Sequence, residues 1–342
     1  MSSVTPVPEV RTSPAGQRLT ARGAWSTARA AGARPVGTET FVRFRYGDGF
    51  SSARALGLQL SLTAIPLVIA VVGLSNELSS GTLGLLLRRT VLALTPGASD
   101  ALLTRALEPL SDAGDERGAE LALWLGLLFA LVSLTTGMGQ VERGVNRIYG
   151  IQRDRPTPVK YLRAALLAGC AGLPAMVGFL VLVSAAAFGE AVEQVYGIDD
   201  DTVSVLAWPP GAGLMLLGIV LMFRRAPRRD QPAWSFLAIG GGAALLVWLL
   251  LTGLLAYYLH LSAGLGSVYG PLTGVMALLL WAQLTAGAIF LGLALCAQLE
   301  AAAAGQHEAA VPDRWNSPAL VLTTVPPRDE RSGGALPRGA DR

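Results

Sequence analysis

Long apolar runs, separated by short segments rich in arginine or in acidic residues, dominate the pattern along the chain. Six of these runs reach the roughly 17 or more residues that a helix needs to cross the hydrocarbon of a bilayer. They occupy residues 55–74, 119–138, 164–188, 207–223, 233–259 and 270–299. Lipid cannot satisfy free backbone donors and acceptors, so each run is expected to be helical. The pattern therefore predicts an all-α fold, a polytopic transmembrane helix bundle of about six spans over residues 41–300.

Prolines and glycines interrupt several of the predicted spans. Pro66 and Pro174 lie inside the first and third spans, where proline removes a backbone donor and kinks the helix, as membrane bundles tolerate. Pro209 and its neighbour are expected in the first turn of the fourth span, where proline costs little. The three glycines at 240–242 either let two helices approach closely or unwind the fifth span, and close packing is the preferred interpretation.

The region between the first two predicted spans differs from the rest. A leucine-rich stretch at residues 82–94 is too short to span a bilayer and carries Arg88 and Arg89 at its centre. It predicts an amphipathic helix, either interfacial or re-entrant. Asp100 then caps a second amphipathic helix after a Pro-Gly break. Residues 75–118 are therefore expected to form an extracytoplasmic helical insert between spans one and two.

Both ends of the chain lack apolar periodicity. Residues 1–40 and 301–342 are rich in small, polar and arginine residues, a composition typical of disordered tails. Between the first tail and the first span, residues 41–50 alternate aromatic side chains with arginines. Both kinds of side chain favour the headgroup level of a membrane, so this segment is expected to lie there.

Charge placement predicts the orientation. The chain has 342 residues, of which 52% are hydrophobic and 15% charged, and a formal net charge of +3 that comes almost entirely from arginine. The segments around Arg153 and Arg228 are basic, whereas the segment around Asp200 is acidic. Because basic loops stay in the cytoplasm, both termini are expected there, in a multi-pass protein of the plasma (inner) membrane. The same rule accounts for the basic balance without nucleic acid as a partner.

Polar side chains inside the predicted spans are few, and most are small. Interhelical hydrogen bonding is the preferred interpretation over a transport site. These residues are Gln59, Ser61, Thr135, Thr136, Gln283 and Thr285. Glu120 and Glu300 lie near span ends and are expected to reach water. With no acid or base clearly at mid-depth, a proton-coupled pump is disfavoured.

The side chains that usually carry catalysis or bind metals are scarce. The two cysteines, Cys170 and Cys296, lie inside apolar runs and are expected to be buried free thiols. The two histidines, His260 and His307, lie far apart in the sequence. Nothing here has the spacing of a metal site, so we predict no catalytic residue, no metal and no cofactor.

One motif stands out, at the end of the second span. Asn146, Arg147, Tyr149 and Gly150 follow one another where the helix is expected to end. Gly150 suits a helix terminus, Tyr149 an interfacial position, and Arg147 can extend to lipid phosphates. A structural elbow at the membrane surface is the preferred interpretation, and a contact to a lipid headgroup or substrate is the alternative.

With this motif, three further features resemble the YihY / virulence factor BrkB family of inner-membrane proteins, once labelled ribonuclease BN. They are residues 64–67 around Pro66, the pair Tyr269-Gly270 before a leucine-rich helix, and the basic, proline-containing segment at 224–234. The resemblance covers about residues 45–300. One departure is in the last span, where residues 292–296 lack the acid and the amide that relatives commonly carry.

Two functions are consistent with these features. The resemblance implies movement of envelope lipid, and we expect transport or translocation of a lipid-like or amphiphilic substrate, with membrane lipids as partners. The alternative is a non-catalytic envelope scaffold or assembly factor that binds a second copy or another envelope protein. Ribonuclease activity is not expected, because the chain lacks clustered acids and a histidine-based acid and base.

Overall fold

The computed structural model describes residues 4–9, 23–77, 116–151, 157–182, 200–261 and 271–310, all of which belong to the unit Met1–Ala310. Within these ranges the regular elements are helical, and one isolated bridge joins Val4 to Ala310. The helices are α2 (Ala24–Ala31), α3 (Ala33–Tyr46), α4 (Gly49–Glu77), α7 (Glu116–Ile148), α8 (Thr157–Leu167), the π-turn η2 (Ala168–Gly172), α10 (Asp200–Arg225), α11 (Trp234–Leu261) and α13 (Pro271–Ala303).

Five stretches among the described residues are helical, long enough and apolar enough to cross a bilayer. They are Trp124–Ile148, Pro158–Leu182, Val205–Arg225, Trp234–Leu261 and Leu272–Ala303. They coincide with the second to sixth spans predicted from the sequence, and the helix α4 contains the first. The prediction of an all-helical bundle of membrane-spanning helices is confirmed for this part of the chain.

Leucine-rich helix faces point outward from the bundle. On α11, Leu246, Leu250 and Leu254 recur every four residues and are 69%, 70% and 61% exposed. Residues four apart share one face of a helix, so these three form a continuous apolar stripe. Such a surface is too large and too apolar to face water in a soluble protein. It is the surface expected of a helix in contact with lipid.

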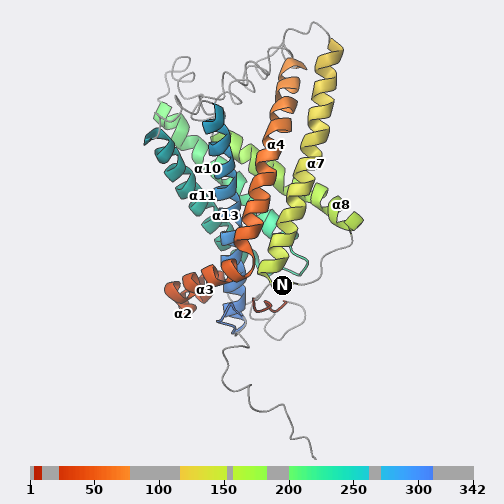
Figure 1. The fold of residues 1–342 in the computed structure, drawn as a ribbon. Helices are drawn as coiled ribbons and strands as arrows, with labels where there is room; N and C mark the ends of the chain where they lie inside the picture. The colour runs from red at the N-terminus through yellow and green to blue at the C-terminus, as the bar shows by residue number, and fades with distance from the viewer. Residues whose placement is uncertain are drawn as a thin grey trace, which may run out of the picture. The chain divides into compact units, whose positions relative to one another are not determined.

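The helices of the bundle pack against one another (Figure 1), and glycines let some of them approach closely. α13 packs against α11 and also against α4, and α4 packs along α7. A Cβ built on Gly240 of α11 would lie 2.7 Å from the Cβ of Cys296, and one built on Gly292 of α13 would lie 2.5 Å from the carbonyl oxygen of Gly240. The preferred interpretation of the glycine run is confirmed at Gly240, whereas a Cβ on Gly242 would meet nothing within 4 Å.

Two of the predicted polar residues join neighbouring helices. The side-chain amide of Gln59 donates to the carbonyl oxygen of Ser133 at 3.3 Å, linking α4 to α7. The indole of Trp248 donates to the hydroxyl of Thr285 at 3.1 Å, linking α11 to α13. The hydroxyls of Ser61 and Thr136 donate instead to carbonyls of their own helices.

The structure departs from the sequence prediction near the N-terminus. Residues 24–40, predicted as part of a disordered tail, form α2 and most of α3. α3 runs to Tyr46, into the segment that was expected at the headgroup level, where Arg43 and Phe44 are buried but the other three aromatic side chains of that segment are exposed. The physical reason lies in a spacing that is visible in the sequence: Val36, Thr40 and Phe44 recur every four residues and share one buried helix face.

Two smaller corrections and one confirmation, at Pro174, concern the later spans. α10 begins at Asp200, so Pro209 and its neighbour lie inside the helix rather than in its first turn. The chain up to residue 182 stays helical past Pro174, which removes a donor two residues after the π-turn η2. Cys170, expected to be buried, is exposed on that turn, whereas Cys296 is buried as predicted.

Some predictions fall on residues that lie outside the described ranges. They are the amphipathic insert at 82–94, the motif pair Tyr269 and Gly270, most of the N-terminal tail before residue 23, and the C-terminal tail after residue 310. α13 ends at Ala303, a few residues beyond the predicted end of the last span.

Candidate binding site at the basic end of the bundle

The ends of several helices meet at one end of the bundle, which we call the basic end. α7, α10 and α13 end there, and α4 and α11 begin there. α7 ends through Gly150, which has a φ of 76°. The N–H of Gly150 donates to the carbonyl of Arg147 and that of Ile151 to the carbonyl of Asn146, the paired bonds of a glycine-terminated helix. The prediction that Gly150 ends this helix is confirmed.

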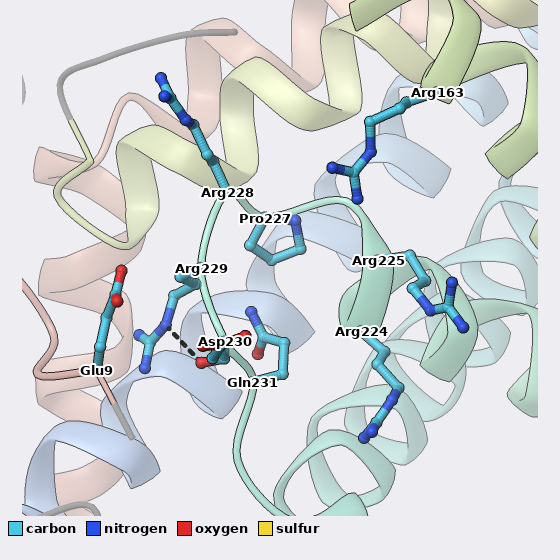
Figure 2. A pocket seen from close by; sticks show the side chains of 9 residues that line it. All are labelled: Glu9, Arg163, Arg224, Arg225, Pro227, Arg228, Arg229, Asp230 and Gln231. Atoms are coloured by element: carbon cyan, nitrogen blue, oxygen red, sulfur yellow. Dashed lines mark hydrogen bonds between the residues drawn. The ribbon is translucent and has the colours of Figure 1, made fainter. Parts of the chain in front are cut away.

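The loop between α10 and α11 lines a basic pocket at this end. The pocket has a volume of about 490 Å³. Figure 2 shows its lining residues, which are Glu9, Arg163, Arg224, Arg225, Pro227, Arg228, Arg229, Asp230 and Gln231. Arginines therefore outnumber acids, and the guanidinium of Arg224 also lies 4.4 Å from the centre of the Trp234 ring. A concave surface with an excess of arginine attracts anions, and guanidinium groups match the oxygens of phosphate and carboxylate.

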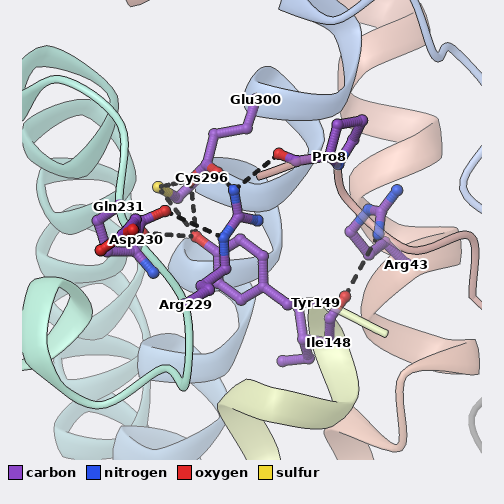
Figure 3. Close-up of polar contacts among 9 residues, drawn as sticks. All are labelled: Pro8, Arg43, Ile148, Tyr149, Arg229, Asp230, Gln231, Cys296 and Glu300. Carbon is purple, nitrogen blue, oxygen red and sulfur yellow. Dashed lines mark hydrogen bonds and ion pairs between the residues drawn. The ribbon is translucent and has the colours of Figure 1, made fainter. Parts of the chain in front are cut away.

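Beneath the pocket, Arg229 reaches into a buried polar cluster formed by Tyr149, Arg229, Gln231, Cys296 and Glu300 (Figure 3). Nη2 of Arg229 lies 3.0 Å from Oε2 of Glu300, and the two side chains are 1% and 0% exposed. The Arg229 guanidinium also stacks 4.5 Å from the centre of the Tyr149 ring. The phenol of Tyr149 donates to Oε1 of Glu300 at 2.7 Å.

Two predictions about these residues are corrected by the cluster. Glu300 was expected to reach water, but it is fully buried because Arg229 and Tyr149 supply the charge and the hydrogen bond that replace solvent. Tyr149 was expected at the membrane interface, but it is 1% exposed. Burial raises the pKa of the Tyr149 phenol well above its usual range, so the phenol is a hydrogen-bond donor at neutral pH.

A second buried arginine, Arg43 of α3, lies beside the cluster. Its Nε donates to Oε1 of Gln298 at 2.9 Å, and its Nη1 donates to the carbonyl oxygens of Thr5 and Ile148. Burial lowers the pKa of Arg43 to about 10, and the nearby Tyr149 and carboxylates oppose that shift. Arg43 thereby ties α3 to α13, to the end of α7 and to the N-terminal segment.

The N-terminal segment at residues 4–9 crosses the basic end. The N–H of Thr5 donates to the carbonyl of Ala309 at 2.9 Å, and the N–H of Val7 donates to the carbonyl of Tyr149 at 3.2 Å. The carbonyl of Pro8 accepts from Nη2 of Arg229 at 3.0 Å, and Glu9 lines the pocket. This short stretch of the predicted disordered tail therefore forms part of the candidate site.

The structure brings together some of the motif residues and separates others. The side-chain oxygen of Asn146 accepts from the backbone N–H of Arg228 at 3.0 Å, which fixes the arginine loop on the end of α7. Arg147 points outward and pairs with Asp48 at 2.9 Å, with both side chains about half exposed. Pro66 lies within the helix α4.

Sequence reasoning treated the arginines at 224–229 as a topology signal and as part of a family feature, and missed their place in the pocket. The signal that could have found it is their density beside two prolines and an acid, in a loop only a few residues long. Within the described ranges, no three His, Cys, Asp or Glu side chains come together as metal ligands would. The arrangement is suited to holding an anion at the end of a membrane helix bundle.

Comparison with known proteins gives the family. The sequence profile described as virulence factor BrkB matches residues 40–316. The chain is also similar to the ribonuclease-like protein YfkH of Bacillus subtilis (strain 168), with 23% identity over 257 residues that cover 74% of this chain and 91% of that protein. No solved structure matches the chain significantly. The profile covers most of the chain and all five helices of membrane-spanning length, and the chain belongs to the virulence factor BrkB family.

Proposed function

We propose that this protein translocates a lipid-like, amphiphilic substrate in the plasma (inner) membrane. The observation that carries the proposal is the arginine-lined pocket at the end of a bundle whose helices expose leucine to their surroundings. An amphiphile needs an apolar surface for its chains and a charged one for its headgroup. This bundle carries both surfaces, the arginines at its basic end and exposed leucines further along its helices.

The proposal includes six spans, with both termini in the cytoplasm. α4 has 29 residues, about 44 Å of helix, with Arg54 and Glu77 as its charged side chains. That length and composition support a sixth span beside the five that meet the requirements for length and hydropathy. The arginines of the pocket support a cytoplasmic position for the basic end. Residues 75–118 are then extracytoplasmic.

We assign no enzymatic activity and no nucleic-acid partner to the protein. The polar groups of the cluster bind one another: the Glu300 carboxylate is held by Arg229 and Tyr149. A general base must be free to accept a proton from its substrate. An acid that is already fixed by an arginine and a phenol is better suited to holding the pocket together than to catalysis.

The test is lipid movement in vesicles that contain purified full-length protein. Fluorescent phosphatidylglycerol is followed by quenching of the outer leaflet, and we expect loss of signal beyond the outer-leaflet half, faster than in empty vesicles. Changing both Arg224 and Arg225 to glutamine should slow this movement several-fold, because the headgroup loses two cationic contacts. The matched control is Arg147→Gln, which removes an arginine from the same end outside the pocket.

Movement at the rate of empty vesicles, for phosphatidylglycerol and for other anionic lipids, would overturn the proposal. If such a result came with one stoichiometric crosslinked partner, either a second copy or another envelope protein, the alternative of a non-catalytic scaffold would be favoured. Equal slowing by the pocket variant and by Arg147→Gln would remove the pocket from the mechanism.

A further inference from the structure

We propose that Arg229 and Gln231 form a seat for one phosphoryl group inside the arginine-lined pocket. The inference deepens the proposed function by naming the chemical group that the site recognises. It rests on the proposed function for the identity of the occupant, a lipid. It depends on two hydrogen-bond donors that are buried in the pocket wall and have no acceptor among the described residues.

Arg229 supplies the first donor. Its Nη2 is used twice, by the Glu300 carboxylate at 3.0 Å and by the Pro8 carbonyl at 3.0 Å, and its Nε approaches the Asp230 carbonyl at 3.4 Å. Its Nη1 is buried and has no partner in the part of the chain that the structure describes. A buried donor without an acceptor costs about 1–3 kcal/mol, more when the group is charged, so such an atom is suited to bind a ligand oxygen.

Gln231 supplies the second donor. Its Oε1 faces the phenol oxygen of Tyr149 at 3.4 Å, while the phenol hydrogen goes to Glu300 at 2.7 Å, and the amide nitrogen of Gln231 is directed away from that oxygen. That nitrogen, Nε2, is buried and has no acceptor within the described ranges. Both side chains converge on Tyr149, since Arg229 stacks on its ring and Gln231 meets its hydroxyl. Two donors fixed on one aromatic side chain are pre-organised for a ligand with several acceptor oxygens.

The charge around the seat favours phosphate over a single carboxylate. Glu300 already neutralises Arg229, so the attraction for an anion comes from the outer arginines of the pocket, Arg163, Arg224, Arg225 and Arg228, against Glu9 and Asp230. A phosphoryl group offers three or more acceptor oxygens and up to two negative charges. The 490 Å³ volume leaves room for the rest of a headgroup.

The experiment measures phosphate binding directly, without any transport. Inorganic phosphate is titrated into the purified full-length protein in detergent by calorimetry, and dihexanoyl phosphatidylglycerol is then added as a competitor beside a monoacylglycerol that lacks phosphate. The test variant is Gln231→Glu, which keeps the size of the side chain and replaces the donor by a carboxylate. The matched control is Gln306→Glu, the same change at an exposed position outside the pocket.

We expect the wild-type protein to bind phosphate saturably. Gln231→Glu should weaken this binding about tenfold or more, as loss of a charge-assisted hydrogen bond predicts, whereas Gln306→Glu should change it by no more than about twofold. Arg229→Lys, which keeps the charge beside Glu300 but loses the planar fork, should weaken binding similarly and serves if Gln231→Glu does not fold. Displacement by the phospholipid identifies a headgroup as the occupant. If the phospholipid does not displace bound phosphate, the seat is supported and its occupant is a free phosphate. The identity of that occupant would count against the proposed function.

Two results would overturn the seat. The first is the absence of saturable phosphate binding to the wild-type protein. The second is equal affinity of the Gln231→Glu and Gln306→Glu variants for phosphate. Either result stands even if the vesicle assay shows lipid movement, so the failure of this inference is distinguishable from the failure of the proposed function.

Discussion

Replacement of Glu300 by glutamine tests whether the buried cluster holds the basic end together. The change keeps the size of the side chain and one carbonyl oxygen that can accept from Tyr149. It removes the negative charge that faces Arg229, whose side chain is 1% exposed. An arginine left buried beside a neutral amide is an uncompensated charge in a low-dielectric environment.

The expected magnitude follows from that burial. Removing one member of a buried ion pair costs about 3–5 kcal/mol, because the remaining charge stays desolvated. The retained bond to Tyr149 places the expected loss for Glu300→Gln near the lower limit, about 3 kcal/mol. The matched control is Asp48→Asn, which breaks the Arg147–Asp48 pair of the same end, whose side chains are about half exposed. An exposed pair contributes about 0–1 kcal/mol, so the control should change little.

Equilibrium unfolding in mixed detergent micelles, followed by tryptophan fluorescence, measures both free energies of unfolding. A double-mutant cycle of Glu300→Gln with Arg229→Met then isolates the pair. The double variant should be more stable than the sum of the two single losses predicts, by about 2 kcal/mol or more, because it leaves no lone charge. Additive losses, or a loss for Glu300→Gln no larger than for Asp48→Asn, would refute the reasoning.

Three further predictions concern the same structure. Gly292→Ala should destabilise the protein by about 1–3 kcal/mol in the same unfolding assay, because its Cβ would lie 2.5 Å from a backbone oxygen of the facing helix. Gly242→Ala is the control and should be neutral or slightly stabilising, because its Cβ would meet nothing within 4 Å. Gly150→Ala should cost about 1–2 kcal/mol, since φ is 76° and its Cβ would lie 2.9 Å from the N-terminal segment; an unchanged midpoint of unfolding would contradict that reason. The raised pKa of Tyr149 keeps its phenol protonated in the folded protein, whereas in the unfolded chain the phenol ionises above about pH 10. The free energy of unfolding is therefore unaffected below about pH 10 and should fall above it, by up to about 1.4 kcal/mol per pH unit. Tyr149→Phe should lack that fall. Arg43, whose lowered pKa of about 10 acts in the opposite direction, remains in both proteins, so the difference between their stability profiles reports on Tyr149. Parallel pH profiles of the two proteins would exclude this effect of Tyr149.

The membrane helices were predictable because their signal is local. A run of apolar residues long enough for a bilayer predicts a helix without any knowledge of its neighbours, and α7, α10, α11 and α13 each contain the predicted stretch to within one residue. The helix ends were less accurate. α7 continues ten residues beyond its predicted span, because the polar residues after Met138 pack inside the protein, where Asn146 binds the arginine loop.

The cluster was not predictable, because its members come from three distant parts of the sequence. Tyr149 follows α7, Arg229 and Gln231 belong to the loop before α11, and Cys296 and Glu300 lie near the end of α13. Each residue alone sits beside a span end, where a charged or aromatic side chain ordinarily meets water or headgroups. Only the packing of α13 against its neighbours brings the carboxylate of Glu300 to its buried partner, the guanidinium of Arg229.

The last helix shows why a motif compared position by position can mislead. Residues 292–296 lack the acid and the amide that relatives commonly carry there. Glu300 lies four residues after Cys296, and residues four apart share one face of a helix. Oε1 of Glu300 lies 3.3 Å from the Sγ of Cys296, so the same face does present a buried acid, one turn further along. The chemistry available to a buried site depends on the face and depth of each side chain, and a shift of four residues leaves the face unchanged.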